Sequence, residues 1–167
     1  FSSDSIYRVD DDLIVSFELI DYQARVGLTI TDEYIGFTLK NLDYFMADFG
    51  VKRKTRIDEF TLLQLPVRDR SNFGEWLNVS WDKELAVNLL ATDPYAKIDA
   101  EQRKGYHIFQ ATAVNEVKLL GVGAALITTE KEKLLDRIDR VERDFDLPLG
   151  VESRRCVAYK NSYYELR

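Results

Sequence analysis

A chain of 167 residues, 46% of them hydrophobic and 12% aromatic, is long enough to bury a core and is not typical of a disordered protein. Its net charge of −6 disfavours nucleic acid and anionic membrane surfaces as partners, because both attract positive charge. No apolar run approaches the roughly 20 residues needed to span a bilayer. With Cys156 as the single cysteine, neither an intrachain disulfide nor a cysteine-based zinc site can form.

The first part of the chain predicts three short strands joined by turns. The runs 13–20 and 24–30 are rich in β-branched and aromatic residues, and the polar break at 21–23 is typical of a hairpin. A third strand is expected over 34–39, where apolar residues alternate with others. The apolar stretch 41–50 has neither the helical nor the strand period, and we interpret it as a loop or a short helical turn.

The middle of the chain predicts further strands bounded by proline and turn residues. One strand is expected over 59–65 and to end at Pro66, which has no amide hydrogen to donate to a sheet. The runs 75–81 and 85–91 are predicted to form a second hairpin around a polar turn.

Three more strands are expected before the end of the predicted domain. Residues 106–114 and 116–120 are predicted to pair with each other, after a polar and charged stretch over 97–105. The apolar run 124–128 is predicted to be a strand as well.

An amphipathic helix over about 129–146 is the clearest local pattern. Thr129 and Glu132 have the spacing of a capping box, in which each side chain bonds to the other residue's backbone amide. One apolar stripe follows at helical spacing, formed by Leu134, Ile138, Val141 and Phe145. Pro148 and Gly150 are expected to stop the helix.

These elements together predict a mostly β protein, an antiparallel β-sandwich-like domain with one C-terminal amphipathic helix. The domain is expected to cover residues 1–150. Residues 151–167 are polar, and we interpret them as a linker or exit segment toward a further domain outside these residues.

Catalytic and metal-binding patterns are weak in this sequence. His107 is the single histidine, so a Ser-His-Asp arrangement would have to use it, but no serine lies in a Gly-x-Ser-x-Gly context. The acidic run 10–12 lacks the spacing of a calcium loop. We therefore assign no catalytic residue, no metal site and no cofactor.

Aromatic side chains suggest a carbohydrate contact. Sugar rings stack on aromatic rings, and nearby carboxylates accept hydrogen bonds from sugar hydroxyls. Trp76, Trp81, Asp93 and Tyr95 are the candidate residues. The alternative is core packing, and because Trp76 and Trp81 would face opposite sides of one strand, at most one of them is expected to point into the core.

The segments WLNVSWDKELAVNLLATDPYAKIDAE (76–101) and GVGAALITTEKEKLLDRIDRVERDFDLPLGVESRR (121–155) support a family resemblance. Their sequences and their order resemble the β-rich region before the catalytic (β/α)8 barrel in bacterial glycoside hydrolases of the alpha-galactosidase-like kind. The resemblance implies a non-catalytic accessory domain, because the catalytic acids of that family lie in the barrel. It also implies a periplasmic or secreted protein.

The partner implied by this resemblance is the catalytic barrel domain of the same polypeptide, together with carbohydrate. Tyr159, Tyr163 and Tyr164 would then lie at the interface between the two domains. The alternative is a stand-alone acidic protein-interaction module of the immunity or adaptor type, which the net charge of −6 and the missing catalytic cluster favour.

Overall fold

The computed structural model describes residues 1–44, 56–114 and 118–147, which form two antiparallel sheets and one helical segment near the C-terminus. The prediction of a mostly β, sandwich-like domain with one C-terminal helix is confirmed. Residues 148–167, including Tyr159, Tyr163 and Tyr164, lie outside the described residues, so the linker and the tyrosine interface stay predictions. No helix in the described ranges is long and apolar enough to cross a membrane.

The larger sheet contains eight antiparallel strands, and its order places β11, the last strand of the described residues, in the middle. Across the sheet these strands are β1 (Ser5–Val9), β2 (Asp12–Phe17), β3 (Tyr22–Ile30), β4 (Ile35–Tyr44), β11 (Gly123–Thr129), β8 (Ala86–Ala91), β7 (Val79–Trp81) and β6 (Asn72–Gly74). Because β11 joins β4 to β8, the N-terminal hairpins and the β6–β8 hairpins belong to one sheet.

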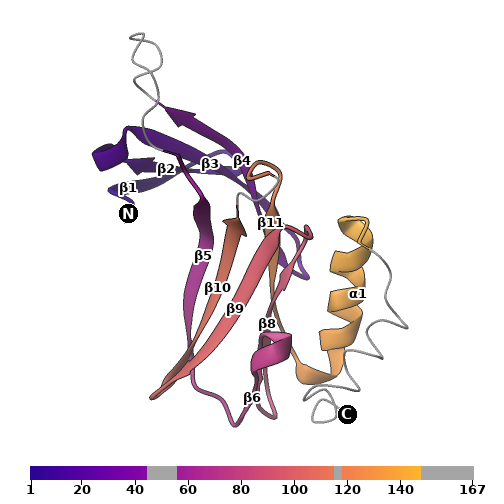
Figure 1. The fold of residues 1–167 in the computed structure, drawn as a ribbon. Coiled ribbons are helices and arrows are strands. Elements are labelled where there is room, and N and C mark those ends of the chain that lie inside the picture. Colours follow the sequence, from indigo (N-terminus) through magenta and orange to yellow (C-terminus); the bar gives the residue numbers. More distant parts are fainter. Residues whose placement is uncertain (45–55, 115–117, 148–167) are drawn as a thin grey trace.

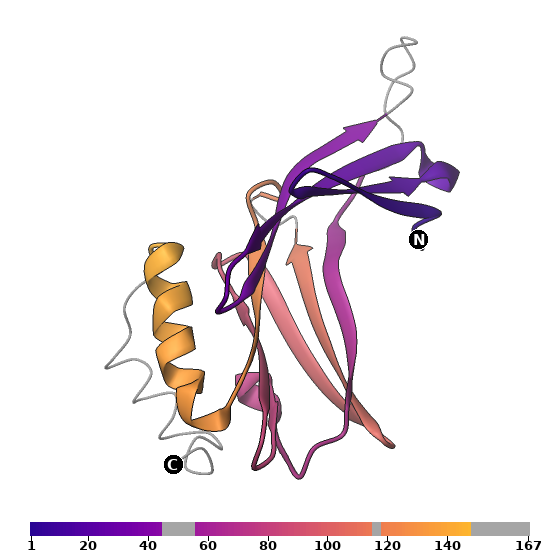
Figure 2. The same cartoon turned by 180° about the vertical axis from the view of Figure 1, so that it is seen from behind.

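The smaller sheet has three strands in the order β5 (Glu59–Arg68), β10 (Tyr106–Val114) and β9 (Ala96–Arg103). It packs against the larger sheet around the main apolar cluster, in which Leu39 and Leu89 of the larger sheet belong with Phe60 and Phe109 of the smaller one. Figures 1 and 2 show that β1–β4 extend across one end of this sheet, whereas β8 runs alongside it.

The C-terminal helix covers the opposite face of the larger sheet (Figures 1 and 2). It begins with a 3-10 turn, η4 (Lys131–Lys133), and continues as α1 (Leu134–Asp144). Beneath it lies a second apolar cluster that includes Leu134, Val141, Ile127 and Trp81. Strand β11 is therefore buried on both faces, with Ala124 in the main cluster and Ile127 in the second, which explains its nearly continuous apolar sequence.

Polar contacts hold α1 against the turn between β3 and β4. The Tyr34 hydroxyl donates a hydrogen bond to Oδ2 of Asp144 at 2.8 Å, and Arg137 pairs with Glu33. Burial and the neighbouring Asp144 carboxylate raise the pKa of Tyr34 to about 12, so the phenol keeps the proton that it donates. Arg140 also pairs with Glu33, with its Nε 3.5 Å from Oε2.

The apolar stripe of the helix is confirmed, but the predicted capping box is wrong. Leu134 and Val141 are buried, and Ile138 and Phe145 pack against the same cluster. Neither η4 nor α1 has a side-chain hydrogen bond at its N-terminal cap, and Thr129 is still part of β11. The 3-10 turn begins only after Glu130, so the threonine lies one residue too early to cap it.

The predicted strand over 75–81 is only partly right, because residues 79–81 form β7 and pair with β8 as expected, whereas 75–77 are not in a strand. The chain forms β6, then a 3-10 turn, η3 (Glu75–Leu77), and then β7. Asn78 separates η3 from β7 and has a left-handed backbone with φ 51°. Asparagine adopts this conformation more readily than most residues, so one position converts an apparent strand into a turn followed by a short strand.

Two strand ends differ from the sequence-based expectation. Strand β4 continues to Tyr44, so residues 41–44 are not a loop or a helical turn, whereas 45–50 lie outside the described residues. Strand β5 runs through Pro66 to Arg68 instead of ending at the proline. Proline is tolerated there because β5 is the outer strand of its sheet, where one side of the backbone needs no partner.

The predicted pairing of 106–114 with 116–120 is wrong. Strand β10 pairs with β5 on one side and with β9 on the other, and residues 118–120 are not in a strand. The sequence pattern does not predict strand β9. Its inward positions hold only Ala96, Ile98 and Ala100, and charged side chains cover its exposed face.

Candidate functional site

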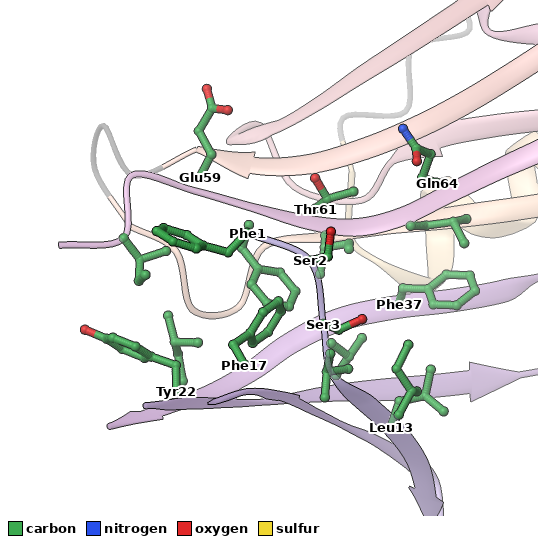
Figure 3. A pocket seen from close by; sticks show the side chains of 18 of the residues that line it. Phe1, Ser2, Ser3, Leu13, Phe17, Tyr22, Phe37, Glu59, Thr61 and Gln64 are labelled. Atoms are coloured by element: carbon green, nitrogen blue, oxygen red, sulfur yellow. The ribbon is translucent and has the colours of Figure 1, made fainter. Parts of the chain in front are cut away.

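An open groove lies between the β1–β4 part of the larger sheet and strand β5 of the smaller one. It encloses about 780 Å³ and is lined mainly by apolar side chains. Figure 3 shows Phe17, Tyr22 and Leu13 along one wall and Thr61 and Gln64 along the opposite wall, with Phe1 between the walls. A volume of this size lies within the range of about 300–1,000 Å³ that is typical of binding pockets.

The strand period explains why the groove is apolar. Leu13, Val15 and Phe17 alternate along β2 and therefore point to the same side of the sheet, into the groove. Phe60 of β5 meets Phe17 edge-to-face, with ring centroids 5.8 Å apart. This aromatic contact joins the two sheets at the groove, and the space beside it stays open.

Two outer strands border the groove. Among the described strands, β1 pairs with β2 alone, and β5 pairs with β10 alone. All residues of β1 are exposed, and Ile6, which lines the groove, is 61% exposed. On the other side of the sandwich, β9 approaches β8 and η3; on the groove side β5 approaches β4, and the groove lies between β5 and the β1–β4 part of the larger sheet.

Acidic residues outnumber basic ones among the charged sequence neighbours of the lining residues, where Arg25 and Arg56 are the basic ones. Exposed carboxylates next in sequence to lining residues are Asp4, Glu18, Asp21 and Asp58, and Glu59 itself lines the groove. Asp58 pairs with Arg56 at 2.7 Å, and the Asp4 carboxylate accepts a hydrogen bond from the Glu18 amide at 2.7 Å. The rim is therefore electrostatically suited to a basic ligand, in agreement with the net charge of the chain.

The two tryptophans predicted to contact carbohydrate have opposite environments. Trp81 is 1% exposed and belongs to the cluster beneath α1, so its ring offers no face to a ligand. The prediction that Trp81 contacts carbohydrate is therefore wrong. Trp76 lies on η3 and is 77% exposed, as a stacking residue must be.

Asp93 and Tyr95 lie together in the turn between β8 and β9. The Tyr95 amide donates a hydrogen bond to Oδ1 of Asp93 at 2.8 Å, and Lys118 Nζ lies 2.8 Å from Oδ2 of the same carboxylate. Lys118 Nζ also lies 5.5 Å from the centroid of the half-exposed Tyr95 ring. The structure thus groups Asp93 with Tyr95 and Lys118, and no contact within the described residues joins Trp76 to this group.

Sequence reasoning missed a contact of the buried Ser80 and His107 with the exposed Asp69. Nδ1 of His107 lies 2.8 Å from the Ser80 hydroxyl, and Nε2 lies 3.0 Å from Oδ1 of Asp69, although that second contact lacks hydrogen-bond geometry. The imidazole stacks on Phe73, with centroids 4.2 Å apart and an angle of 13° between the planes. Burial holds the pKa of His107 below its ordinary value of 6.5, against the opposing effect of the Asp69 carboxylate.

These three residue types form the triad of many acyl-transfer enzymes, but this arrangement does not support nucleophilic catalysis. Ser80 and His107 are both fully buried, so a substrate carbonyl has no access to the serine oxygen. The contact instead joins β7 of the larger sheet to β10 of the smaller one. No group of three or more potential metal ligands occurs in the described part of the chain.

A scan against protein-family models and searches of curated proteins and of solved structures found no match to this chain.

Proposed function

We propose that this chain is a non-catalytic accessory domain of a glycoside hydrolase, which packs on the catalytic barrel of the same polypeptide. The observation that carries the proposal is the open apolar groove between β1–β4 and β5. The resemblance of 76–101 and 121–155 to the region before the barrel in alpha-galactosidase-like enzymes supplies the identity of the partner.

The energetics of exposed apolar surface support packing against another domain. On β1, Ile6 is 61% exposed, Tyr7 50% and Val9 45%. Covering such side chains is worth about 25 cal/mol for each Å² removed from water. An outer strand with exposed apolar residues also promotes aggregation unless something covers it. A neighbouring domain would both gain the burial energy and protect the strand.

The exposed aromatic residues support a carbohydrate contact at the surface of the domain. Trp76 presents most of its ring to solvent on η3, and Tyr95 is 38% exposed beside the Asp93 carboxylate. An accessory domain that contacts sugar through these residues would hold substrate near a neighbouring catalytic site without taking part in the reaction.

A glycosidase assay on the native polypeptide tests this proposal. An antibody raised against residues 1–147 should precipitate, from the source cells, a protein that hydrolyses a chromogenic α-galactoside or a related glycoside. The isolated chain should be inactive in the same assay, since the resemblance places the pair of catalytic carboxylic acids in the barrel. A precipitate without glycosidase activity on a panel of such glycosides would contradict the proposal.

A second candidate is a stand-alone acidic interaction module. The net charge of −6 and the carboxylates around the groove favour it, because acidic immunity and adaptor proteins neutralise basic partners. This candidate requires the precipitated complex to contain a separate basic polypeptide, whereas the accessory domain requires a single longer chain.

A further inference from the structure

We infer that the groove accepts an extended polypeptide strand from outside these 167 residues, which pairs with the edge of β5 that has no partner among the described strands and inserts apolar side chains between the two sheets. The inference extends the proposed function and rests on it in one respect: the strand would come from the rest of the same polypeptide. The acceptance of a strand itself is a property of this chain alone.

The first argument is the pairing of the bordering strands. Among the described strands, β1 and β5 each have one partner, and both contribute to the groove lining. An outer strand carries a row of unpaired amide and carbonyl groups along its free side. An extended peptide satisfies these groups with main-chain hydrogen bonds, which is how strand addition to a sheet edge gives affinity.

The second argument is the shape and chemistry of the interior. Phe17 and Leu13 of β2 line the groove together with Phe60 and Leu62 of β5, and the Phe17–Phe60 ring contact forms one side of it. A strand in this space would direct every second side chain into the groove and the others to solvent. The groove therefore selects a segment in which apolar residues alternate with polar ones.

The third argument is that polypeptide already fits between the walls. Residues Phe1 to Ser3 line the groove and belong to no strand (Figure 3). They are anchored beside it by Asp4, whose amide donates to the Ser16 carbonyl at 2.9 Å. The groove is thus wide enough for main chain, and β5 still has no second pairing partner among the described strands.

Charge determines the outward residues of the strand. Glu59 lines the groove, the exposed Asp4, Glu18 and Asp21 are next in sequence to lining residues, and Arg56 already pairs with Asp58. Lysine or arginine at the solvent-facing positions would complement this rim, whereas acidic residues there would be repelled. The occupant we infer is therefore an extended segment that alternates apolar with basic residues.

The test uses a synthetic peptide that alternates valine with lysine and has about the length of a typical strand. We expect it to bind the chain and to slow amide hydrogen exchange in β5 and β1, without comparable protection at the outer strand β9. A peptide of the same composition with its valines and lysines in separate blocks should not protect β5, nor should one that alternates valine with glutamate. Equal binding of the alternating and block peptides would overturn the inference, as would protection that appears at β9 instead of β5.

Two neutral substitutions on one strand provide a matched comparison. Ile6→Gln removes an exposed apolar side chain that lines the groove, and Val9→Gln removes one on the other face of β1. Since burying an aliphatic side chain is worth about 1.5–3 kcal/mol, Ile6→Gln should weaken peptide binding about tenfold or more. Val9→Gln should leave it unchanged, and equal losses in the two variants would contradict a strand inside the groove.

Two further outcomes separate this inference from its rivals. If the chain self-associates in sedimentation and the peptide competes with that association, the natural occupant is a second copy, and the inference of a strand from the rest of the polypeptide is wrong. If the peptide results are as expected but the native protein is not a glycosidase, the strand site stands and the proposed function fails.

Discussion

The buried histidine shows how one residue couples protonation to folding. His107 is fully enclosed between the sheets, with the Ser80 hydroxyl at Nδ1 and the Asp69 carboxylate near Nε2. In the unfolded chain the imidazole titrates near its ordinary pKa of 6.5, and in the folded state burial lowers that pKa. Below pH 6.5 the unfolded state therefore binds more protons, and protonation favours unfolding.

We expect the free energy of unfolding to decrease as the pH falls below about 6.5 toward the lowered pKa of His107, and to depend little on this group above 6.5. Urea denaturation at a series of pH values measures the effect. In His107→Gln this component should disappear, although the variant should be less stable by about 1–3 kcal/mol at neutral pH because Ser80 loses its buried partner. The same slope between pH 5 and 7 in wild type and variant would contradict this account.

At the same scale, the exposed ring of Trp76 is the residue on which the carbohydrate contact depends most. Removing it in Trp76→Ala should weaken binding of an α-galactoside about threefold to tenfold, the range expected for loss of one stacked aromatic ring. Stability should change little, because the side chain is 77% exposed. Calorimetric titration measures the affinity, and Tyr106→Ala, at another exposed aromatic residue, is the control. Unchanged affinity in Trp76→Ala would remove this residue from the site.

At the scale of elements, predictability followed the strength of the periodic signal. The helix was found because Leu134, Ile138, Val141 and Phe145 repeat at helical spacing, and that stripe is buried as expected. Strand β9 was not found, since small or single apolar residues on its inward face give almost no alternation. The turn η3 was not found either, because the left-handed conformation of Asn78 leaves no pattern in the neighbouring residues.

The helix should be an important source of stability because it covers the second apolar cluster. Leu134→Ala removes a side chain that is 2% exposed, and we expect a loss of about 2–5 kcal/mol in the free energy of unfolding. Leu19→Ala removes the same atoms at a site that is 79% exposed and should change stability by less than about 0.5 kcal/mol. Chemical denaturation of both variants measures the difference. Similar small losses in both would mean that α1 is not required for the fold.

At the scale of the whole molecule, the candidate site depends on topology that the sequence does not display. The groove is formed by strands from residues 5 to 68, and its opening depends on which edges of the described strands have no partner once β11 lies between β4 and β8. The Ser80–His107 contact likewise joins residues 27 positions apart on different sheets. Local patterns predicted most of the strands, but neither the order of the strands nor the side on which the sandwich stays open.

The size of the native polypeptide tests the central claim most directly. An immunoblot of source cells with an antibody against this chain compares that polypeptide with the 19.4 kDa of these 167 residues. An accessory domain that packs on a barrel predicts a single species several times larger, since (β/α)8 barrels alone contain about 250 residues. A species of 19.4 kDa would contradict the account and leave the stand-alone acidic interaction module as the better explanation.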